Sequence, residues 1–167
     1  MLSGYAGARR VIDKSGLRVE LLQTLTGSLE AARAAHAAAV AGATDDEARP
    51  ENDKDTRGLE QSYLARGQAQ RVAELEAAVA EVGALGLRAF GAPDRIAIGA
   101  LVTLEEDGRE HQFFVAPHGG GSVLTGGVQV ITPGSPLGRA LVGRRIDDEV
   151  EVRLPGKLRC FVIVALA

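Results

Sequence analysis

Aromatic residues and cysteine are scarce in this chain of 167 residues. Tryptophan is absent and all aromatic residues together make up 4% of the sequence, so alanine, valine, leucine and isoleucine must build any core. Cys160 is the only cysteine, which excludes an internal disulfide and fits a reducing cytoplasm. Because Cys160 falls in an alternating apolar segment, we expect a small buried side chain there and not a catalytic thiol.

Long apolar runs are also missing. No run approaches the roughly 20 residues that a membrane-spanning helix needs. Residues 1–10 lack the apolar core of an export signal. We therefore expect neither membrane insertion nor an export signal.

The net charge of −3 is unevenly distributed along the chain. Residues 44–60 hold seven acids and three bases, a net of −4, whereas the other 150 residues sum to +1. This balance argues against autonomous binding of duplex nucleic acid through a basic face. The acidity is instead concentrated in one short segment.

Residues 13–41 and 58–84 carry the heptad spacing of a coiled coil. In the first segment the repeating positions are Leu22, Leu25, Leu29, Ala32, His36 and Ala39. In the second segment they are Val72, Leu75, Val79 and Val82. Gly42, Pro50 and the acidic segment separate the two, which predicts an antiparallel helical hairpin about 40 Å long. His36 lies on the seam, where we expect a packed or edge histidine and not a metal ligand.

After residue 84 the sequence changes to glycines and short alternating segments. Gly83, Gly86, Gly91 and Pro93 indicate a linker, and we place a helical domain at residues 1–88 and a second domain at residues 89–167. The expected strands cover residues 96–104, 111–115, 128–131, 149–154 and 158–166, with turns at 106–108 and 155–156. Strands grouped with a single helix predict an α+β fold.

That single helix is expected between Ser135 and Gly143. Ser135 is a good N-cap, because its hydroxyl can accept a hydrogen bond from a free backbone N–H of the first turn. Pro136 then occupies the first helical position, where its missing N–H costs nothing. Gly143 follows the last apolar pair and can take the left-handed conformation that ends a helix.

The segment Ser135-Pro136-Leu137-Gly138 and the residues that follow it resemble a signature in the C-terminal domain of bacterial Gre transcription elongation factors. Other elements follow the family's order: Phe113-Phe114-Val115, a glycine-rich turn, Ile131-Thr132, Asp147/Asp148-Glu149-Val150 and Phe161-Val162-Ile163. The resemblance covers residues 95–167 and implies a β-sheet domain similar to FK506-binding proteins. In the family this loop and helix lie near the surface that docks on RNA polymerase, so the resemblance implies partner contacts by Ser135, Pro136 and Leu137.

Two catalytic interpretations of the same region fit the residues less well. A prolyl isomerase needs a proline pocket walled by aromatic side chains, and residues 96–167 offer only Phe113, Phe114 and Phe161. The run from His118 to Gly121 is similar to the oxyanion segment of esterases, but neither serine nearby has the required flanking glycines. We therefore expect a glycine turn at residues 119–121.

The family resemblance also extends, more loosely, to the acidic segment. Gre factors present acids at a coiled-coil tip, in the pattern Asp-x-x-Glu-Ala-Arg, that help to hold Mg²⁺ in the polymerase active site. Here Glu47-Ala48-Arg49 matches the end of that pattern, Thr44 stands at its first position, and Asp45 and Asp46 follow it. The resemblance implies catalytic roles for Asp45, Asp46 and Glu47, with Asp46 and Glu47 as metal ligands. A calcium loop fits poorly, since Arg49 and Pro50 fall where a ligand and a glycine are required.

The sequence thus favours a bacterial, cytoplasmic, Gre-like factor that is expected to be a monomer and is not itself an enzyme. The resemblance implies binding to RNA polymerase, indirect contact with nascent RNA and insertion of the acidic tip into the secondary channel, with stimulated cleavage of backtracked RNA. No tightly bound cofactor is expected, only Mg²⁺ shared with the polymerase active site. Two alternatives stay open: a channel binder that does not support cleavage, and a hairpin that serves only as a protein-interaction module.

Overall fold

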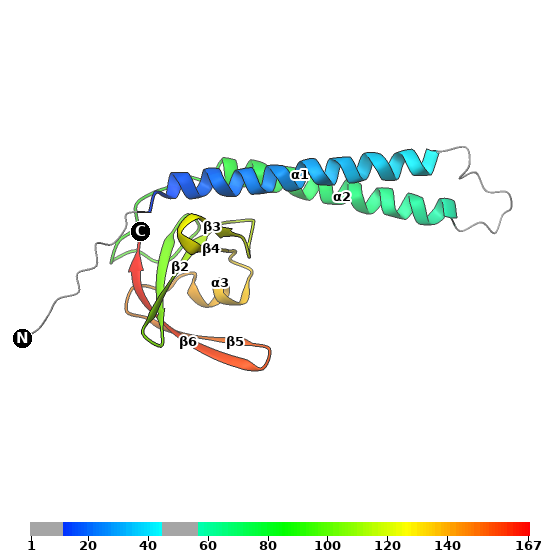
Figure 1. The fold of residues 1–167 in the computed structure, drawn as a ribbon. Helices are drawn as coiled ribbons and strands as arrows, with labels where there is room; N and C mark the ends of the chain where they lie inside the picture. The colour runs from blue at the N-terminus through cyan, green and yellow to red at the C-terminus, as the bar shows by residue number, and fades with distance from the viewer. Residues whose placement is uncertain (1–11, 45–56) are drawn as a thin grey trace, which may run out of the picture.

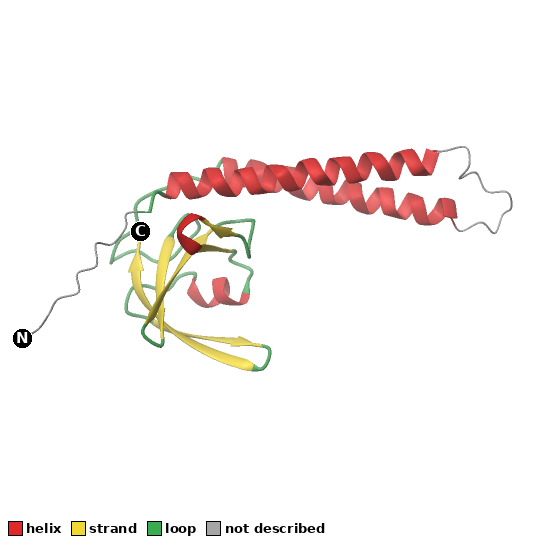
Figure 2. Cartoon of the chain, in the orientation of Figure 1, coloured by secondary structure: helices red, strands yellow, loops and turns green. Residues whose placement is uncertain are grey.

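The computed structural model describes residues 12–44 and 57–167. Two long antiparallel helices, α1 (Lys14–Thr44) and α2 (Arg57–Gly83), lie side by side and extend past the β domain (Figures 1 and 2). These bounds confirm the predicted helical hairpin. No helix in the described ranges is long and apolar enough to cross a membrane.

The hairpin begins at an N-cap and is held by an apolar seam. Asp13 accepts hydrogen bonds from the backbone N–H groups of Ser15 at 2.9 Å and Gly16 at 3.1 Å, which satisfies the free donors of the first turn of α1. Buried residues of the seam include Leu25, Leu29, Ala32, Leu75, Ala78 and Val82. His36 is half-buried, and its Nδ1 lies 3.2 Å from the carbonyl oxygen of Ala65, as expected for a packed or edge histidine.

The β domain is a six-stranded sheet with the strand order β3-β4-β2-β1-β6-β5. Its strands are β1 (Leu101–Glu106), β2 (Arg109–Val115), β3 (Val123–Leu124), β4 (Val128–Ile131), β5 (Glu149–Leu154) and β6 (Lys157–Leu166). Strands β2 and β4 are parallel and all other neighbours are antiparallel. A short helix, α3 (Pro136–Leu141), packs beside β5. The predicted α+β fold is confirmed.

The strand expected at residues 96–104 begins later than predicted, at Leu101. Gly99 has a φ of 90°, and the N–H of Ala100 bonds to the carbonyl of Ala97 at 3.1 Å, so the chain turns there. Ile96 is nonetheless buried, whereas Ile98 is 43% exposed. The alternating pattern therefore reflected a buried turn and not an extended strand.

Both predicted hairpin turns are present. Asp107 and Gly108 have φ angles of 52° and 74°, and Glu106 pairs with Arg109 across them, as a two-residue turn with both central residues left-handed requires. Pro155 and Gly156 likewise connect the paired ends of β5 and β6. Local turn chemistry thus fixes the register of both hairpins.

Two apolar cores hold the molecule together. The first joins the hairpin to one face of the sheet and contains Leu17, Leu21, Leu25, Leu29, Ala32, Leu75, Ala78, Val82, Leu101, Phe114, Ala116, Leu124, Val128 and Val130. The second lies on the other face, under α3, and contains Phe90, Ile96, Ala100, Val102, Leu104, Phe113, Val115, Ile131, Leu141, Val150, Val152, Phe161, Ile163 and Leu166. The expected linker contributes to both, since Leu85 and Leu87 pack against the first core and Phe90 is buried in the second.

The prediction that Cys160 is a buried side chain is wrong. Phe161 and Ile163 point into the second core, and because side chains alternate along a strand, Cys160 and Val162 point to the opposite face of the sheet. Cys160 lies opposite Glu151 of β5 and is exposed.

Candidate partner-binding surface

Helix α3 begins at a fully formed cap. The hydroxyl of Ser135 accepts a hydrogen bond from the N–H of Gly138 at 3.0 Å and donates one to the carbonyl of Thr132 at 2.8 Å. The N–H of Ser135 also bonds to the carbonyl of Thr132, at 3.0 Å. Pro136 occupies the first helical position, as predicted. Two hydrogen bonds therefore fix Ser135 to Thr132, directly after β4, and a third caps the first turn of the helix.

Gly138 permits the close approach on which the cap depends. A Cβ atom built on Gly138 would lie 1.9 Å from the carbonyl oxygen of Thr132 and 3.0 Å from Oγ of Ser135. Gly138 is also buried. Glycine is therefore required at this position because a side chain would clash with the backbone of Thr132, and not because of an unusual backbone angle.

The three predicted contact residues differ in their exposure. Pro136 is exposed and Ser135 is half-buried. Leu137 is only partly exposed, because its side chain packs against the second core. Pro136 is thus the apolar group that the helix start presents outward, and Leu137 contributes to the fold as well.

The far end of α3 is closed by glycine and flanked by arginines. Gly143 has a φ of 86°, its N–H bonds to the carbonyl of Ile96 at 2.8 Å, and Arg95 donates to its carbonyl at 2.8 Å. Arg95 is exposed, as are Arg144 and Arg139. Arg95 and Arg144 therefore lie near the end of the helix, whereas the guanidinium of Arg139 reaches back and donates to the carbonyl of Gly134 before the helix start.

The predicted catalytic and metal-binding acids Asp45, Asp46 and Glu47 lie outside the described residues. Among residues 12–44 and 57–167, no group of three or more histidine, cysteine, aspartate or glutamate side chains is arranged to hold a metal ion. The tip prediction thus stays a prediction.

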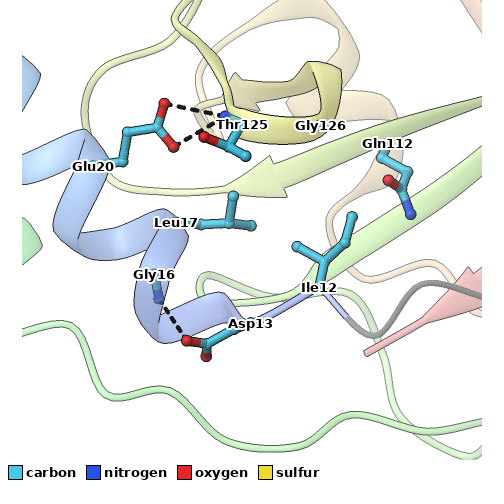
Figure 3. Close-up of a pocket in the computed structure, with 8 residues that line it drawn as sticks. All are labelled: Ile12, Asp13, Gly16, Leu17, Glu20, Gln112, Thr125 and Gly126. Carbon is cyan, nitrogen blue, oxygen red and sulfur yellow. Dashed lines mark hydrogen bonds between the residues drawn. The ribbon is translucent and has the colours of Figure 1, made fainter.

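Hydrogen bonds fix the base of the hairpin against the sheet. The carboxylate of Glu20 accepts the N–H of Thr125 with both oxygens, at 2.9 and 3.1 Å (Figure 3). Beside this contact lies a pocket of about 440 Å³, lined by Ile12, Asp13, Gly16, Leu17, Glu20, Gln112, Thr125 and Gly126. Figure 3 shows α1 on one side of the pocket, and the sheet with the short 3-10 helix η2 (Thr125–Gly127) on the other.

A second contact joins the glycine loop to α2: Nε2 of His118 lies 3.0 Å from the carboxylate of Glu81, which is on α2. The loop approaches so closely that a Cβ on Gly119, which has a φ of 82°, would lie 2.5 Å from Leu21. The predicted glycine turn is therefore one of the places where the hairpin packs on the β domain.

The segment after α2 is held by two cations of α1. Arg18 donates to the carbonyl of Leu85 at 2.8 Å, and Lys14 donates to the carbonyls of Arg88 and, at 3.3 Å, Gly99. Lys14 lies 4.9 Å and Arg88 lies 3.6 Å from the ring of Phe90. Partial burial, and secondarily the charge of Arg88, lower the pKa of Lys14 below its ordinary value. The expected linker is thus bound to the start of α1 by hydrogen bonds from Lys14 and Arg18.

A partly buried ion pair lies beside Phe161 of the second core. Arg159 donates to Glu106 through Nε at 2.7 Å and through a second nitrogen, and its guanidinium lies 4.7 Å from the ring of Phe161. The hydrogen bonds from Arg159 lower the pKa of Glu106, and the same bonds raise that of Arg159.

Because the folded state lowers the pKa of Glu106, this pair stabilises the fold above the ordinary pKa of a glutamate and loses its effect as the pH falls through the lowered value. We expect Glu106→Gln to lower the melting temperature near neutral pH and to have progressively less effect as the pH falls below about 4. Thermal unfolding of both proteins across this pH range tests the expectation. A difference that does not change with pH would contradict it.

The contacts at the base of the hairpin were not predicted from the sequence. Glu20 and Thr125, like Glu81 and His118, are far apart in the chain and belong to no local motif. One available signal was the uninterrupted apolar run from Phe113 to Ala116, which is typical of a strand covered on both faces.

These features define an α+β protein in which a long helical hairpin is fixed to a β domain that carries a capped, surface-exposed helix. The family model described as "Transcription elongation factor, GreA/GreB, C-term" matches residues 91–167. The transcription elongation factor GreA of Syntrophus aciditrophicus is 32% identical over 116 residues, which cover 68% of this chain and 68% of that protein. The chain therefore belongs to the GreA/GreB family of transcription elongation factors.

Other relatives match over different lengths. GreA of Sphingopyxis alaskensis is 38% identical over 74 residues, 44% of this chain, so the chain spans about half (45%) of that relative's length. Among solved structures, GreA factor homolog 1 (Gfh1) of Thermus thermophilus is 25% identical, covers 87% of this chain and 94% of its own, and has a TM-score of 0.39.

Proposed function

We propose that this chain binds RNA polymerase in the cytoplasm through the start of α3 and presents the acidic segment between its helices in the secondary channel of the enzyme. The observation that carries the proposal is the rigid cap, in which Ser135 and Gly138 hold Pro136 outward at the family's signature. A fixed apolar group on a preorganised helix binds at a lower entropic cost than one on a flexible loop. Contact with nascent RNA is then indirect.

Two forms of this function are compatible with the tip sequence. In the first, Asp45, Asp46 and Glu47 supply carboxylate oxygens to Mg²⁺ in the polymerase active site and stimulate cleavage of backtracked RNA. In the second, the tip occupies the channel without cleavage. The second form is favoured by Thr44, which stands where the family pattern has an acid. We place the first form ahead, because two acids directly follow that position.

Pro136→Asp is expected to weaken polymerase binding at least tenfold, about 1.4 kcal/mol. An aspartate in the first turn is compatible with the helix, since it interacts favourably with the N-terminal end of the dipole. Binding of the full chain to core polymerase, measured by fluorescence anisotropy, gives the affinity. Val123→Asp, at a position 65% exposed on β3, is the matched control and should bind like the wild type. A folded Pro136→Asp protein of unchanged affinity would remove α3 from the proposal.

Neutralising the tip is expected to separate binding from cleavage. The triple change Asp45→Asn, Asp46→Asn and Glu47→Gln should leave polymerase affinity and helix content unchanged, because acids clustered in one segment repel one another and their loss does not weaken the seam. The same change should abolish cleavage in stalled, backtracked complexes. If the wild type at saturating concentration stimulates no cleavage, the channel binder without cleavage becomes the function. If the wild type does not bind core polymerase at all, the interaction module remains.

A further inference from the structure

The pocket between α1 and the β domain has an apolar floor. Leu17, which is 3% exposed, and the half-buried Ile12 line it, and its volume of about 440 Å³ falls in the range of small-molecule sites. Figure 3 shows these two side chains between Glu20 and Thr125 on one side and Gln112 on the other. An apolar floor with a few polar groups at its margin is the usual arrangement of a site for a small organic molecule.

Glycines leave both walls of the pocket open. Gly16 belongs to α1 and Gly126 belongs to η2. A Cβ atom on Gly126 would meet nothing within 4 Å, and a Cβ on Gly16 would meet only Asp13, whose Oδ2 lies in ordinary contact at 3.4 Å. Packing therefore does not require glycine at position 16, although glycine lowers helix stability relative to alanine. The effect of Gly16 on the structure is to leave space beside Leu17.

The charged residues that line the pocket are both acidic. They are Asp13 and Glu20, and neither forms an ion pair with a described residue. Asp13 uses both carboxylate oxygens to cap the first turn of α1. The cations of the same turns, Lys14 and Arg18, donate instead to carbonyl groups of the segment after α2. The pocket is therefore negatively charged, which disfavours an anionic ligand.

Glu20 and Gln112 have unused hydrogen-bonding capacity. The carboxylate of Glu20 accepts the N–H of Thr125, and each of its oxygens keeps a further lone pair. Gln112, on β2, is half-buried, and its side-chain amide has no hydrogen-bond partner among the described residues. A charged acceptor on α1 and a neutral amide on the β domain thus stand at opposite sides of the apolar floor (Figure 3).

We propose that this pocket binds a small organic cation, in which an ammonium group is joined to an apolar body. The ammonium group donates to the carboxylate of Glu20, and the body packs on Leu17 and Ile12 in the space beside Gly16. A polar group at the far end of the body bonds to the amide of Gln112. A charge-assisted hydrogen bond is roughly twice as strong as a neutral one, and removal of the apolar body from water adds to the affinity.

The proposed ligand would touch both parts of the molecule. It contacts Gly16 and Glu20 on α1 and Gln112 on the β domain, beside the hydrogen bonds that join Glu20 to Thr125. Because the ligand binds only when these parts are in contact, its binding stabilises the joint between the hairpin and the β domain.

The site goes beyond the proposed function. None of the residues that line it belongs to α3 or to the acidic segment between the long helices. Binding of a small cation here requires no polymerase, so the two proposals are tested by separate measurements.

Two-dimensional amide NMR of the full chain, titrated with tryptamine near neutral pH, tests the site. Tryptamine combines an ammonium group with an apolar ring that carries an N–H donor. We expect saturable shifts of the amide signals of Gly16, Thr125 and Gly126, with a dissociation constant on the order of 1 mM. Tryptophol, which lacks the charge, and ethylamine, which lacks the ring, should bind at least about tenfold more weakly. Ethylamine also controls for general attraction of cations to the acids of residues 44–60.

Two variants remove separate parts of the site. Glu20→Gln removes the charge but keeps an oxygen that can accept the N–H of Thr125, and Gly16→Leu fills the space beside the floor. Each should weaken tryptamine binding at least about tenfold. Glu30→Gln and Gly27→Leu are the matched controls, at exposed positions of α1 outside the pocket, and both should bind like the wild type.

Four results would overturn the proposal. Tryptamine could cause no saturable shift at the pocket, or shifts confined to residues outside it. Tryptophol or ethylamine could bind as tightly as tryptamine, which would show that one of the two parts of the ligand is not recognised. Folded Glu20→Gln and Gly16→Leu proteins could bind tryptamine like their controls.

Discussion

Replacing Gly138 with alanine is expected to destabilise the β domain by at least about 3 kcal/mol, at the upper end of the costs of overpacking. The added Cβ would lie 1.9 Å from the carbonyl oxygen of Thr132, which is backbone and cannot rotate away. Relief requires α3 to move from the end of β4, and that movement would break the bonds that Ser135 makes to Thr132 and Gly138. Chemical denaturation of wild type and variant measures the loss.

Gly134→Ala provides the matched control for this substitution. Gly134 lies four residues earlier in the same segment, and a Cβ there would meet nothing within 4 Å. Its replacement should change the free energy of unfolding by less than about 0.5 kcal/mol, as for most surface substitutions. Equal effects of the two variants would show that the close contact at Gly138 does not limit the fold.

Leu21→Ala is expected to cost about 2–5 kcal/mol, the usual range for truncating a buried leucine. Leu21 is 0% exposed, lies on α1 and touches the glycine loop of the β domain near Gly119. The variant removes atoms from the core that joins the hairpin to the sheet, so both the hairpin and the β domain should lose stability. Denaturation followed separately by helical ellipticity and by the environment of Phe114 should shift in both signals.

Val19→Ala is the control for Leu21→Ala. Val19 is on the same helix but 49% exposed, so its truncation should cost well under 1 kcal/mol, roughly as at other surface positions. If Leu21→Ala lowered the stability of the helices and left the sheet transition unchanged, the two parts would unfold independently. The boundary predicted between residues 88 and 89 would then also divide two folding units.

Much of the fold could be predicted because its signals are local. Heptad spacing located both helices, and Ser135, Pro136 and Gly143 located α3, since capping chemistry acts within a single turn. The turns at Asp107-Gly108 and Pro155-Gly156 were predictable for the same reason. Each of these features depends on residues fewer than about ten positions apart.

The features that escaped prediction depend on distant parts of the chain. The alternation from Ile96 to Ala100 fits a strand, but the N–H of Ile96 bonds to the carbonyl of Arg144, and that remote contact stabilises a turn. Cys160 has apolar neighbours, and only the side of the sheet on which Phe161 packs decides that Cys160 faces solvent. In the candidate site, Leu137 could not be distinguished from Pro136 as a contact residue, because its burial arises from packing on the second core.

The hydrogen bonds at the base of the hairpin also set the angular tolerance of its far end. Beyond Leu29, the last leucine of the shared core on α1, the helix continues to Thr44, a lever about 22 Å long. A rotation of about 5° at the base would displace the end of this lever by roughly 2 Å. A misplacement of about 1 Å can reduce the rate of a positioned catalytic group about 100-fold. The contacts of Glu20 with Thr125 and of Glu81 with His118 therefore restrict rotation of the hairpin relative to the β domain. The stiffness of this joint limits how accurately the far end of the helices is positioned.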